Sequence, residues 1–214
     1  MAAVRLIGGS HFRQRIICST LSGRTVRIDD IRVDTDAPGV TDYEANFLRL
    51  IDKMTNGSKI EINETGTTLK YVPGFILGGK VQHDCGNSRY SFLFNLWLNS
   101  WLCIYLRFPR AIGWFLEAVI PLCIFAKSPI TLLLRGITND DVDLSVDSLR
   151  TVILPTLKVI LWHSFAVPLL SWPSLAFNSH YPCSWTGQHF GIDEGLELKI
   201  KKRGAPPNGG GEVC

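Results

Sequence analysis

Arginine side chains are concentrated near the start of the chain, at positions from which they could bind RNA phosphates. Guanidinium groups suit this role because they keep their charge and donate paired hydrogen bonds to phosphate oxygens. We predict Arg13, Arg15 and Arg32 as RNA- or phosphate-binding residues. A solvated basic surface explains the same pattern equally well, and it would also include Arg24 and Arg27.

One short run combines a histidine, an acid and a cysteine, which are residue types found in nucleophilic sites. In His83-Asp84-Cys85, a strand would place the histidine and the cysteine on one face and the aspartate on the other. The three side chains would then not act together. The sequence favours a strand-end cluster without a catalytic role.

The remaining candidate clusters lack the spacing that their chemistry needs. Gly209-Gly210-Gly211 is not followed by the Lys-Ser/Thr pair of a phosphate-binding loop, which favours a turn. The aspartates within residues 140–147 lack the calcium-loop pattern and fit turns and helix caps. The histidines and the cysteine within residues 163–189 lack zinc-ligand spacing. We therefore predict no catalytic residue, no metal site and no cofactor.

The length and composition indicate a folded protein of ordinary charge. The chain has 214 residues, of which 46% are hydrophobic and 19% are charged; this excludes a disordered protein and allows one large or two small domains. A net charge of +3 permits RNA binding without requiring it. Six cysteines without a C-x-x-C pair indicate a reducing compartment, and the first residues lack the apolar core of a secretory signal.

Hydrophobic periodicity predicts the elements that would position these side chains. A capping box at Thr41 and Glu44 opens one of the predicted helices. In chain order, the predicted elements are a helix at 10–21, a strand at 25–33, a helix from the capping box to Met54, and a hairpin with strands at 59–63 and 67–72.

A similar order of elements recurs later in the chain. It consists of a helix at 111–125, a strand at 130–135, a helix from Ser145 to about 158, and a strand at 196–201. Both copies place an aspartate-bearing loop between their strand and their second helix. The recurrence predicts two similar α/β units.

Two uncharged, aromatic-rich segments interrupt the second copy, at residues 91–106 and 159–189. As membrane spans they would be poor, because the first falls short of about 20 residues and Pro168 and Pro173 interrupt the second. The alternative is that residues 90–110 and 159–189 are translated intron sequence. Removing them joins the flanking segments into a continuous sequence pattern. Both explanations stay open at the level of the sequence.

Several segments resemble the RNA 3′-terminal phosphate cyclase superfamily, and in particular its eukaryotic cyclase-like branch of ribosome biogenesis. The similar segments, in chain order, are GGSHFRQRIICSTLSGRTVRIDDIR, DAPGVTDYEANFLRLIDKMTNGSKIEINETGTTLKYVPGFILGGKVQHDCG, AIGWFLEAV, LRGITNDDVDLSVDSLR and FGIDEGLELKIKKRGAPPNGGGEV. They cover most of the chain outside the two apolar segments.

The resemblance implies an α+β fold of tandem repeats, each with two helices packed on a four-stranded sheet, as in RNA cyclases and EPSP-synthase-like proteins. Because the family pattern continues past residue 214, the chain is expected to be a truncated, N-terminal part of a family member. The expected division is a first repeat at 1–83, a second repeat at 84–89, 111–158 and 190–214, and apolar insertions at 90–110 and 159–189.

Departures from the cyclase pattern argue against cyclase activity. True cyclases use a nucleophilic histidine from a later part of their chain than these residues. In their N-terminal motif only the glycines and Arg13 match here, without the glutamate, and Thr35 and Tyr43-Glu44 stand in place of a basic residue and a Gln-His pair. A triphosphate is bound by cationic side chains or N–H donors. A threonine and a carboxylate at these positions therefore make the site less complementary to a triphosphate.

The resemblance implies a function in pre-rRNA processing for the small ribosomal subunit. The implied partners are pre-rRNA, the small-subunit processome and a ribosome-biogenesis GTPase; the implied location is the nucleolus, within the nucleus, and no membrane association is expected. Some members of this branch are proposed to cleave pre-rRNA through residues of a later part of the chain. Two alternatives stay open: an ATP-dependent RNA 3′-terminal phosphate cyclase and, from the apolar segments, a small membrane protein.

Overall fold

The computed structural model describes residues 3–86, 92–93, 103–104, 110–160, 197–205 and 210–214. The chain divides into two compact units, and each is described by itself. The first unit comprises Met1–Val146 and Ile200–Cys214, and the second comprises Asp147–Lys199. All of the sheets in the described residues belong to the first unit.

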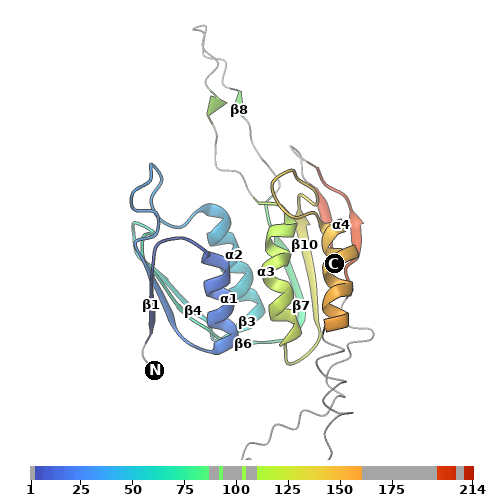
Figure 1. The fold of residues 1–214 in the computed structure, drawn as a ribbon, viewed down its shortest axis with the longest axis horizontal. Coiled ribbons are helices and arrows are strands. Elements are labelled where there is room, and N and C mark those ends of the chain that lie inside the picture. The colour runs from blue at the N-terminus through green and yellow to red at the C-terminus, as the bar shows by residue number, and fades with distance from the viewer. Residues whose placement is uncertain (1–2, 87–91, 94–102, 105–109, 161–196, 206–209) are drawn as a thin grey trace, which may run out of the picture. The chain divides into compact units, whose positions relative to one another are not determined.

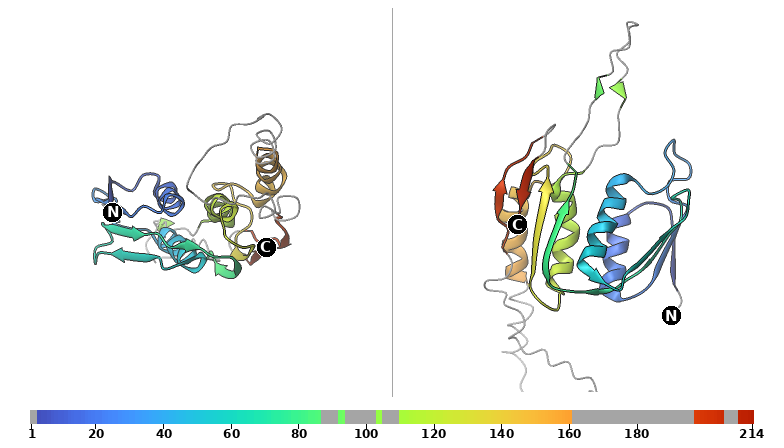
Figure 2. Two further views of the ribbon diagram at one scale, coloured as in Figure 1. Left: turned by 90° about the horizontal axis from the view of Figure 1, so that it is seen from below. Right: turned by 180° about the vertical axis from the view of Figure 1, so that it is seen from behind.

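Six elements form the first repeat. They are β1 (Val4–Ile7), α1 (Phe12–Ser22), β2 (Val26–Asp29), α2 (Asp42–Met54), β4 (Lys59–Ile62) and β5 (Leu69–Val72). The strands form a sheet in the order β1-β2-β5-β4, in which β1 and β2 are parallel and the other two pairs are antiparallel. Both helices lie on the same side of this sheet (Figures 1 and 2).

The same strand arrangement recurs in the second repeat. Its elements in the first unit are β7 (Gly79–Asp84), α3 (Ile112–Ile124), β10 (Ile130–Gly136), β11 (Ile200–Lys202) and β12 (Gly211–Val213). The strand order is β7-β10-β12-β11, with β7 and β10 parallel and the other two pairs antiparallel. The pairing scheme is therefore that of the first sheet.

Shorter elements complete the described part of the chain. β3 (Thr55–Asn56) pairs with β6 (Phe75–Ile76), and β8 (Phe92–Leu93) pairs with β9 (Cys103–Ile104). The described residues of the second unit are mainly helical. This stretch runs from α4 (Val146–Ser148) through a π-helical segment, η1 (Leu149–Ile153), to residues 154–160, and it confirms the helix predicted after Ser145.

Local sequence explains where the helices of the first repeat begin and end. α1 ends at Gly23, whose φ of 66° lies in the left-handed region that glycine adopts without strain. α2 begins with the predicted capping box, in which the Glu44 carboxylate accepts the N–H of Thr41 at 2.9 Å. Its apolar positions recur at helical spacing and bury one face, formed by Phe47, Leu48, Leu50, Ile51 and Met54.

The core of the first unit lies between its sheets and helices. Trp114 of α3 packs edge-on against two rings of α2, with centroid distances of 5.3 Å to Tyr43 and 5.7 Å to Phe47. Each buried large apolar side chain contributes about 1.5–3 kcal/mol to stability. This core therefore joins the two repeats as well as filling each of them. The buried positions of the first sheet are Val26, Ile28, Leu69 and Tyr71.

Polar side chains of α2 cover the free edge of the second sheet. β7 is the terminal strand of that sheet, so its outer backbone groups have no neighbouring strand in it. Asn46 Nδ2 donates to Asp84 O at 3.0 Å, and Lys53 Nζ donates to Gln82 O at 3.2 Å. These two bonds fix α2 of the first repeat against the second sheet.

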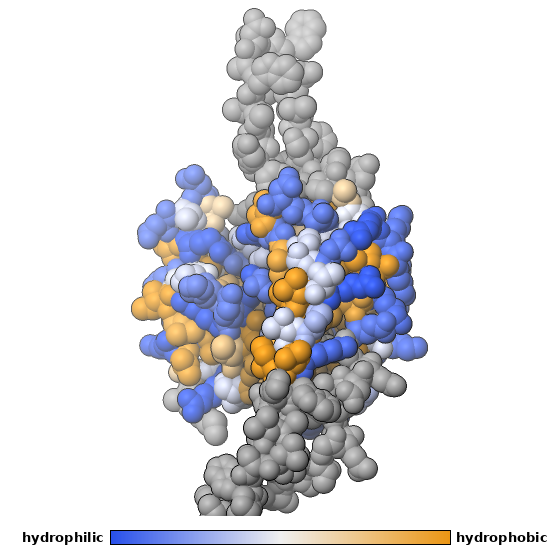
Figure 3. Space-filling view, turned by 45° about the vertical axis from the view of Figure 1, so that its right-hand side comes forward, coloured by the Kyte–Doolittle hydropathy of each residue, from blue (hydrophilic) through white to orange (hydrophobic). Residues whose placement is uncertain are grey.

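Some hydrophobic side chains reach the surface. Phe75 and Phe125 line an open pocket together with Leu21 and Lys127, and Lys127 Nζ lies 4.8 Å from the centre of the Phe75 ring. On the face of the molecule drawn in Figure 3, patches of hydrophobic residues lie among hydrophilic ones. Scattered exposed apolar residues are common on folded proteins.

Several strands differ from the sequence-based expectation, and β7 and β12 lie outside the ranges predicted as strands. The strand predicted at 25–33 ends at Asp29, because Asp30 and Arg32 have φ values of 56° and 50° and turn the chain out of the sheet. The strand predicted at 196–201 is wrong in its bounds, since β11 spans Ile200–Lys202. β1 escapes prediction, because four residues show too little alternation.

Strand pairing also bears on the expected repeats and insertions. β7 pairs within the second sheet, whereas the expected division at residue 83 assigned most of it to the first repeat. The apolar segments lie almost wholly outside the described residues, so intron sequence and membrane spans both stay predictions. In the part of the chain that the structure describes, no helix is long and apolar enough to cross a membrane.

Candidate functional site

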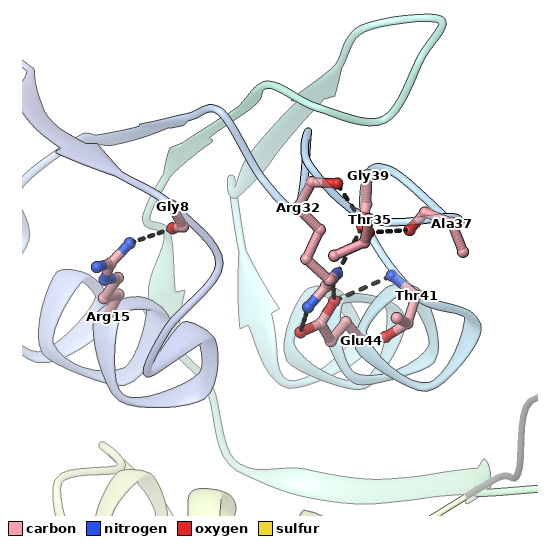
Figure 4. Close-up of polar contacts among 8 residues, drawn as sticks. All are labelled: Gly8, Arg15, Arg32, Thr35, Ala37, Gly39, Thr41 and Glu44. Atoms are coloured by element: carbon pink, nitrogen blue, oxygen red, sulfur yellow. Dashed lines mark hydrogen bonds and ion pairs between the residues drawn. The ribbon is translucent and has the colours of Figure 1, made fainter.

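Two loops lie at the edge where the parallel strands β1 and β2 end and where α1 and α2 begin (Figure 4). Residues 8–11 connect β1 to α1, and residues 30–41 connect β2 to α2. Ligand sites of α/β folds gather at such edges, because helix N-termini and loop side chains meet there. Arg15 and Arg32, two of the predicted phosphate ligands, contact these loops.

Arg32 is bound to Glu44 and to the backbone of its own loop. Its Nη1 donates to Glu44 Oε1 at 3.1 Å, its Nη2 pairs with Oε2, and its Nε donates to Gly39 O at 2.9 Å. Glu44 is only 4% exposed, and its Oε2 also accepts the N–H of Thr41. The carboxylate therefore neutralises the arginine and occupies the helix N-terminus at which an anionic ligand would bind.

Thr35 stabilises the turn of this loop. Its hydroxyl lies 2.9 Å from Arg32 O and 3.1 Å from Ala37 O, and its N–H donates to Arg32 O at 3.3 Å. Figure 4 shows these contacts beside the Arg32–Glu44 pair. The position that the resemblance assigns to a basic residue in true cyclases is therefore a neutral turn here.

Arg15 holds the loop that leads from β1 into α1. Its Nη1 donates to Gly8 O at 2.6 Å, and its Nη2 donates to Ile7 O at 3.2 Å. Gly8 and His11 have φ values of 78° and 54°, so the loop turns sharply between the strand and the helix. Arg15 stabilises this turn by satisfying two of its carbonyl groups.

Arg13 points from α1 toward α3. Its Nη1 donates to Trp114 O at 2.5 Å and lies 3.0 Å from Glu117 Oε2. Its guanidinium carbon lies 4.4 Å from the centre of the Trp114 ring. Arg13 thus joins the two repeats through a hydrogen bond, an ion pair and a cation–π contact.

The structure places the three predicted arginines in different surroundings. Arg15 and Arg32 lie at one edge of the first sheet, whereas Arg13 lies between α1 and α3. Each guanidinium group has a carbonyl or carboxylate acceptor within the chain. These contacts explain the arginines structurally, and a phosphate-binding role for them stays a prediction.

A second carboxylate closes a helix N-terminus in the same manner. Asp143 Oδ2 accepts the N–H of Ala111 at the start of α3 at 2.9 Å, and Oδ1 lies 2.9 Å from Arg110 Nη1. The Asp143 side chain is only 5% exposed. The sequence predicted turn or cap chemistry for this aspartate-rich loop, but it could not show which helix is capped. It missed Arg110, which the expected insertion at 90–110 included.

The His83-Asp84-Cys85 run has the predicted arrangement, with His83 and Cys85 buried and Asp84 exposed. Burial, followed by the positive charge of Lys53, lowers the pKa of His83 to about 4. Burial raises the pKa of the Cys85 thiol. Both groups are therefore neutral near pH 7, and a neutral buried thiol is a poor nucleophile. These properties agree with a structural cluster at the end of β7.

The metal and phosphate candidates are tested only in part. Within the described ranges, no group of three His, Cys, Asp or Glu side chains could hold a metal ion. Asp140 Oδ1 accepts the N–H of Val142 at 3.0 Å, which is turn chemistry as predicted. The histidines and the cysteine within residues 163–189, and Gly209, lie outside the described residues.

Comparison with known protein families identifies the one to which this chain belongs. The sequence profile of the family described as RNA 3′-terminal phosphate cyclase matches residues 4–176. The chain belongs to this family. Membership in the RNA 3′-terminal phosphate cyclase family confirms the predicted resemblance and the predicted α+β fold class of helices on four-stranded sheets.

Three relatives show which members of the RNA 3′-terminal phosphate cyclase family the chain is similar to. It is 46% identical to the probable RNA 3′-terminal phosphate cyclase-like protein of Dictyostelium discoideum and 45% identical to the RNA 3′-terminal phosphate cyclase-like protein of Mus musculus, with 96% of this chain and 42% of each relative covered. The rRNA processing protein rcl1 of Schizosaccharomyces pombe is 37% identical, with 98% of this chain and 44% of the relative covered. The chain therefore spans less than half the length of these relatives.

Proposed function

We propose that this member of the cyclase family acts in rRNA processing during ribosome biogenesis. The support comes from relatives named rRNA processing proteins, in Schizosaccharomyces pombe at 37% identity and in Saccharomyces cerevisiae at 33%. Relatives at 44–46% identity are named cyclase-like proteins. The chain spans less than half their length, so the activity of the whole relatives comes to it only as a proposal.

The contacts of Glu44 carry the second part of the proposal, which is that the protein does not cyclise RNA ends. A bound triphosphate would need cations and N–H donors at the edge where α2 begins. Glu44 already occupies that position and neutralises Arg32. A phosphate that took Arg32 would leave the buried Glu44 carboxylate without its cation, and an uncompensated buried charge costs about 3–5 kcal/mol.

The finer features of the proposal rest on the resemblance. We assign the role to maturation of the small ribosomal subunit, in the nucleolus within the nucleus. The proposed partners are pre-rRNA, the small-subunit processome and a ribosome-biogenesis GTPase. None of these features requires a membrane.

Depletion of the protein in its own cells tests the proposed role. We expect precursors of the small-subunit rRNA to accumulate, and expression of the gene from a plasmid to restore normal precursor levels. Northern blotting with probes on either side of the small-subunit rRNA measures both results. Unchanged precursors, or accumulation confined to large-subunit precursors, would contradict the proposal.

Labelling with radioactive ATP and Mg²⁺ tests the absence of cyclase chemistry. A cyclase forms a covalent nucleotidyl adduct and converts an RNA 3′-phosphate into a cyclic phosphate. We expect neither product from this protein, with an active RNA 3′-phosphate cyclase as the positive control. A labelled adduct that survives denaturing electrophoresis would overturn this part of the proposal.

A further inference from the structure

The first sheet has an outer face that points away from α1 and α2. Along β2 and β5, alternate side chains are buried toward the helices, as at Ile28 and Tyr71, which are both 0% exposed. The residues between them, Arg27 and Lys70, point the other way, and each of these side chains is 42% exposed. The outer face is therefore accessible along the middle of the sheet.

One row across this outer face carries three cations in succession. The strand register pairs Arg5 with Arg27, Arg27 with Lys70, and Lys70 with Glu61. Neighbouring strands are about 4.8 Å apart, so three positive charges adjoin before a negative one follows. Like charges directly opposite one another destabilise a sheet. Three cations and one carboxylate give the row a net charge of +2, which the sheet alone does not favour.

Two carboxylates position these cations and leave them accessible. Asp29 Oδ1 lies 2.8 Å from Arg27 Nε, and Glu61 Oε2 lies 2.9 Å from Lys70 Nζ. Asp29 bonds to the Nε atom of Arg27. The two terminal nitrogens of Arg27 have no partner among the described residues and stay available to a ligand. Arg5 is exposed on the edge strand β1 and has no ion pair in the described part of the chain.

The second sheet shows that the same pairing scheme can carry a compensated row. Its outer face places four charges side by side, in the order Asp84, Arg135, Glu212 and Lys202. Arg135 Nε lies 3.1 Å from Glu212 Oε1. This row alternates in sign and has no net charge. The excess of cations in the row of the first sheet is therefore not a requirement of the fold.

We propose that the cationic row formed by Arg5, Arg27 and Lys70 binds the sugar–phosphate backbone of RNA. This inference rests on the proposed function and deepens it, since it names the surface that would hold the RNA. A phosphodiester chain supplies regularly spaced negative charges that match adjoining cations. Protein partners usually bind through aromatic or apolar anchors at the centre of an interface, and this row has none. Without aromatic side chains for base stacking, binding is expected to be independent of base sequence.

Matched double variants of the 214-residue chain test this surface. Arg5→Ala/Arg27→Ala removes two cations from the cationic row, and Arg135→Ala/Lys202→Ala removes two cations from the alternating row. Fluorescence anisotropy with a short labelled single-stranded RNA, over a series of salt concentrations, measures the affinity. Two lost phosphate contacts should weaken binding about 10-fold near physiological salt and reduce the slope of log K against log salt by about 1.4. The control variant should stay within about twofold of the wild type.

A third variant gives a gain that misfolding cannot produce. Glu61→Gln removes the only carboxylate of the row and releases the Lys70 ammonium group. RNA affinity should rise about threefold, since one repulsive charge beside the phosphates is lost. Circular dichroism of all three variants checks that they keep the native secondary structure.

Several outcomes would overturn the proposal. Equal losses of RNA affinity in the two double variants would show that binding depends only on the net charge of the protein and not on the cationic row. Tighter binding to polyglutamate than to RNA would indicate an acidic protein as the partner. Unchanged RNA affinity in Arg5→Ala/Arg27→Ala would refute the surface alone, whatever the depletion experiment shows. Normal rRNA precursors in depleted cells would refute the proposed function, even if that variant loses RNA affinity.

Discussion

The two four-stranded sheets share a pairing scheme and differ in the charges of their outer faces. In the first sheet, Arg5, Arg27 and Lys70 adjoin across three strands. In the second sheet, acids and bases alternate, and Arg135 pairs with Glu212 at 3.1 Å. Strand pairing uses backbone groups that every residue except proline supplies, so outward side chains can vary without changing the topology. The comparison teaches that the repeat architecture does not determine the surface.

The inner faces of the two sheets differ as well. In the first sheet, the Tyr71 hydroxyl lies 2.9 Å from the Thr20 hydroxyl, so both buried groups are satisfied. In the second sheet, His83 Nδ1 lies 3.4 Å from Lys53 Nζ, and the buried Nε2 has no partner among the described residues. The second repeat therefore has a titratable group in its core that carries a cost of burial.

Removing the carboxylate at the start of a helix should have the largest effect on stability. Each repeat has one such carboxylate, so the two variants compare the repeats directly. Glu44→Ala leaves Arg32 and the N-terminus of α2 without their partner, so the free energy of unfolding should fall by about 4 kcal/mol. Asp143→Ala should cost about 3 kcal/mol at α3, because its partner Arg110 is more exposed than Arg32. Urea titration followed by circular dichroism measures both losses.

The control for this pair is Glu44→Gln, which keeps a hydrogen-bond acceptor for the helix N-terminus and removes the charge. Its stability should lie between those of the wild type and Glu44→Ala. Wild-type stability in Glu44→Ala would show that the carboxylate does not close the site, and it would weaken the argument against nucleotide binding.

Acid should destabilise the protein through His83 of the second sheet, and alkali should destabilise it through Tyr71 of the first sheet. Burial first, and the Lys53 charge second, lower the pKa of His83 to about 4, below its ordinary value of about 6.5, so protonation favours the unfolded chain. The contribution of neutral His83 to the free energy of unfolding is complete above about pH 7. About 3 kcal/mol of that free energy should be lost as the pH falls to about 4. Burial raises the pKa of Tyr71, so its contribution is full below about pH 10 and is lost as the pH rises further.

Urea midpoints measured across this pH range test the assignment. His83→Gln should flatten the acid side of the stability profile, and Tyr71→Phe should flatten the alkaline side. A full acid loss in His83→Gln would assign the dependence to other groups and remove this difference between the sheets.

The contact between the repeats should give a smaller effect. Asn46→Ala removes the donor to Asp84 O at the free edge of β7, so stability should fall by about 1 kcal/mol. Amides of β7 should also exchange faster in a hydrogen-exchange experiment. Gln82→Ala, at an exposed side chain of the same strand, should change stability by less than about 0.5 kcal/mol. Equal effects of the two variants would show that the edge bond is unimportant.

The charge rows should give the smallest effects on stability, with opposite signs. Arg5→Ala relieves repulsion with Arg27, so stability should rise by about 0.3 kcal/mol. Arg135→Ala removes the partner of Glu212, so stability should fall by about 0.5 kcal/mol. Thermal unfolding at low and high salt measures both, and salt should reduce the difference. Changes of the same sign would contradict the contrast between the two rows.

Elements with local signals could be predicted from the sequence. The capping box of Thr41 and Glu44, the helix stop at Gly23 and the hairpin of β4 and β5 all depend on residues close together in the chain. The alternation of His83, Asp84 and Cys85 is also local, and the structure confirms it. β1 could not be predicted, because its four residues gain their strand conformation from pairing with β2.

The edge beside Arg32 could be predicted only in part. The sequence placed Thr35 and Glu44 where a triphosphate site would need basic groups, but it could not show that Glu44 pairs with Arg32. Arg13 had the same predicted role as Arg15, yet its partners Trp114 and Glu117 follow more than 100 residues later. Spacing along the chain carries no information about such contacts.

By itself, the sequence determined the helices, the strands with a local signal, the capping box of α2, the helix stop at Gly23 and the family, because each depends on residue types at short spacing. Only the tertiary structure decided which charges are neighbours. Arg5, Arg27 and Lys70 adjoin because strand register brings three distant segments together, and Arg13 faces α3 because the core holds two repeats in contact. Charge interactions depend on distance in space and on burial, and folding alone sets both.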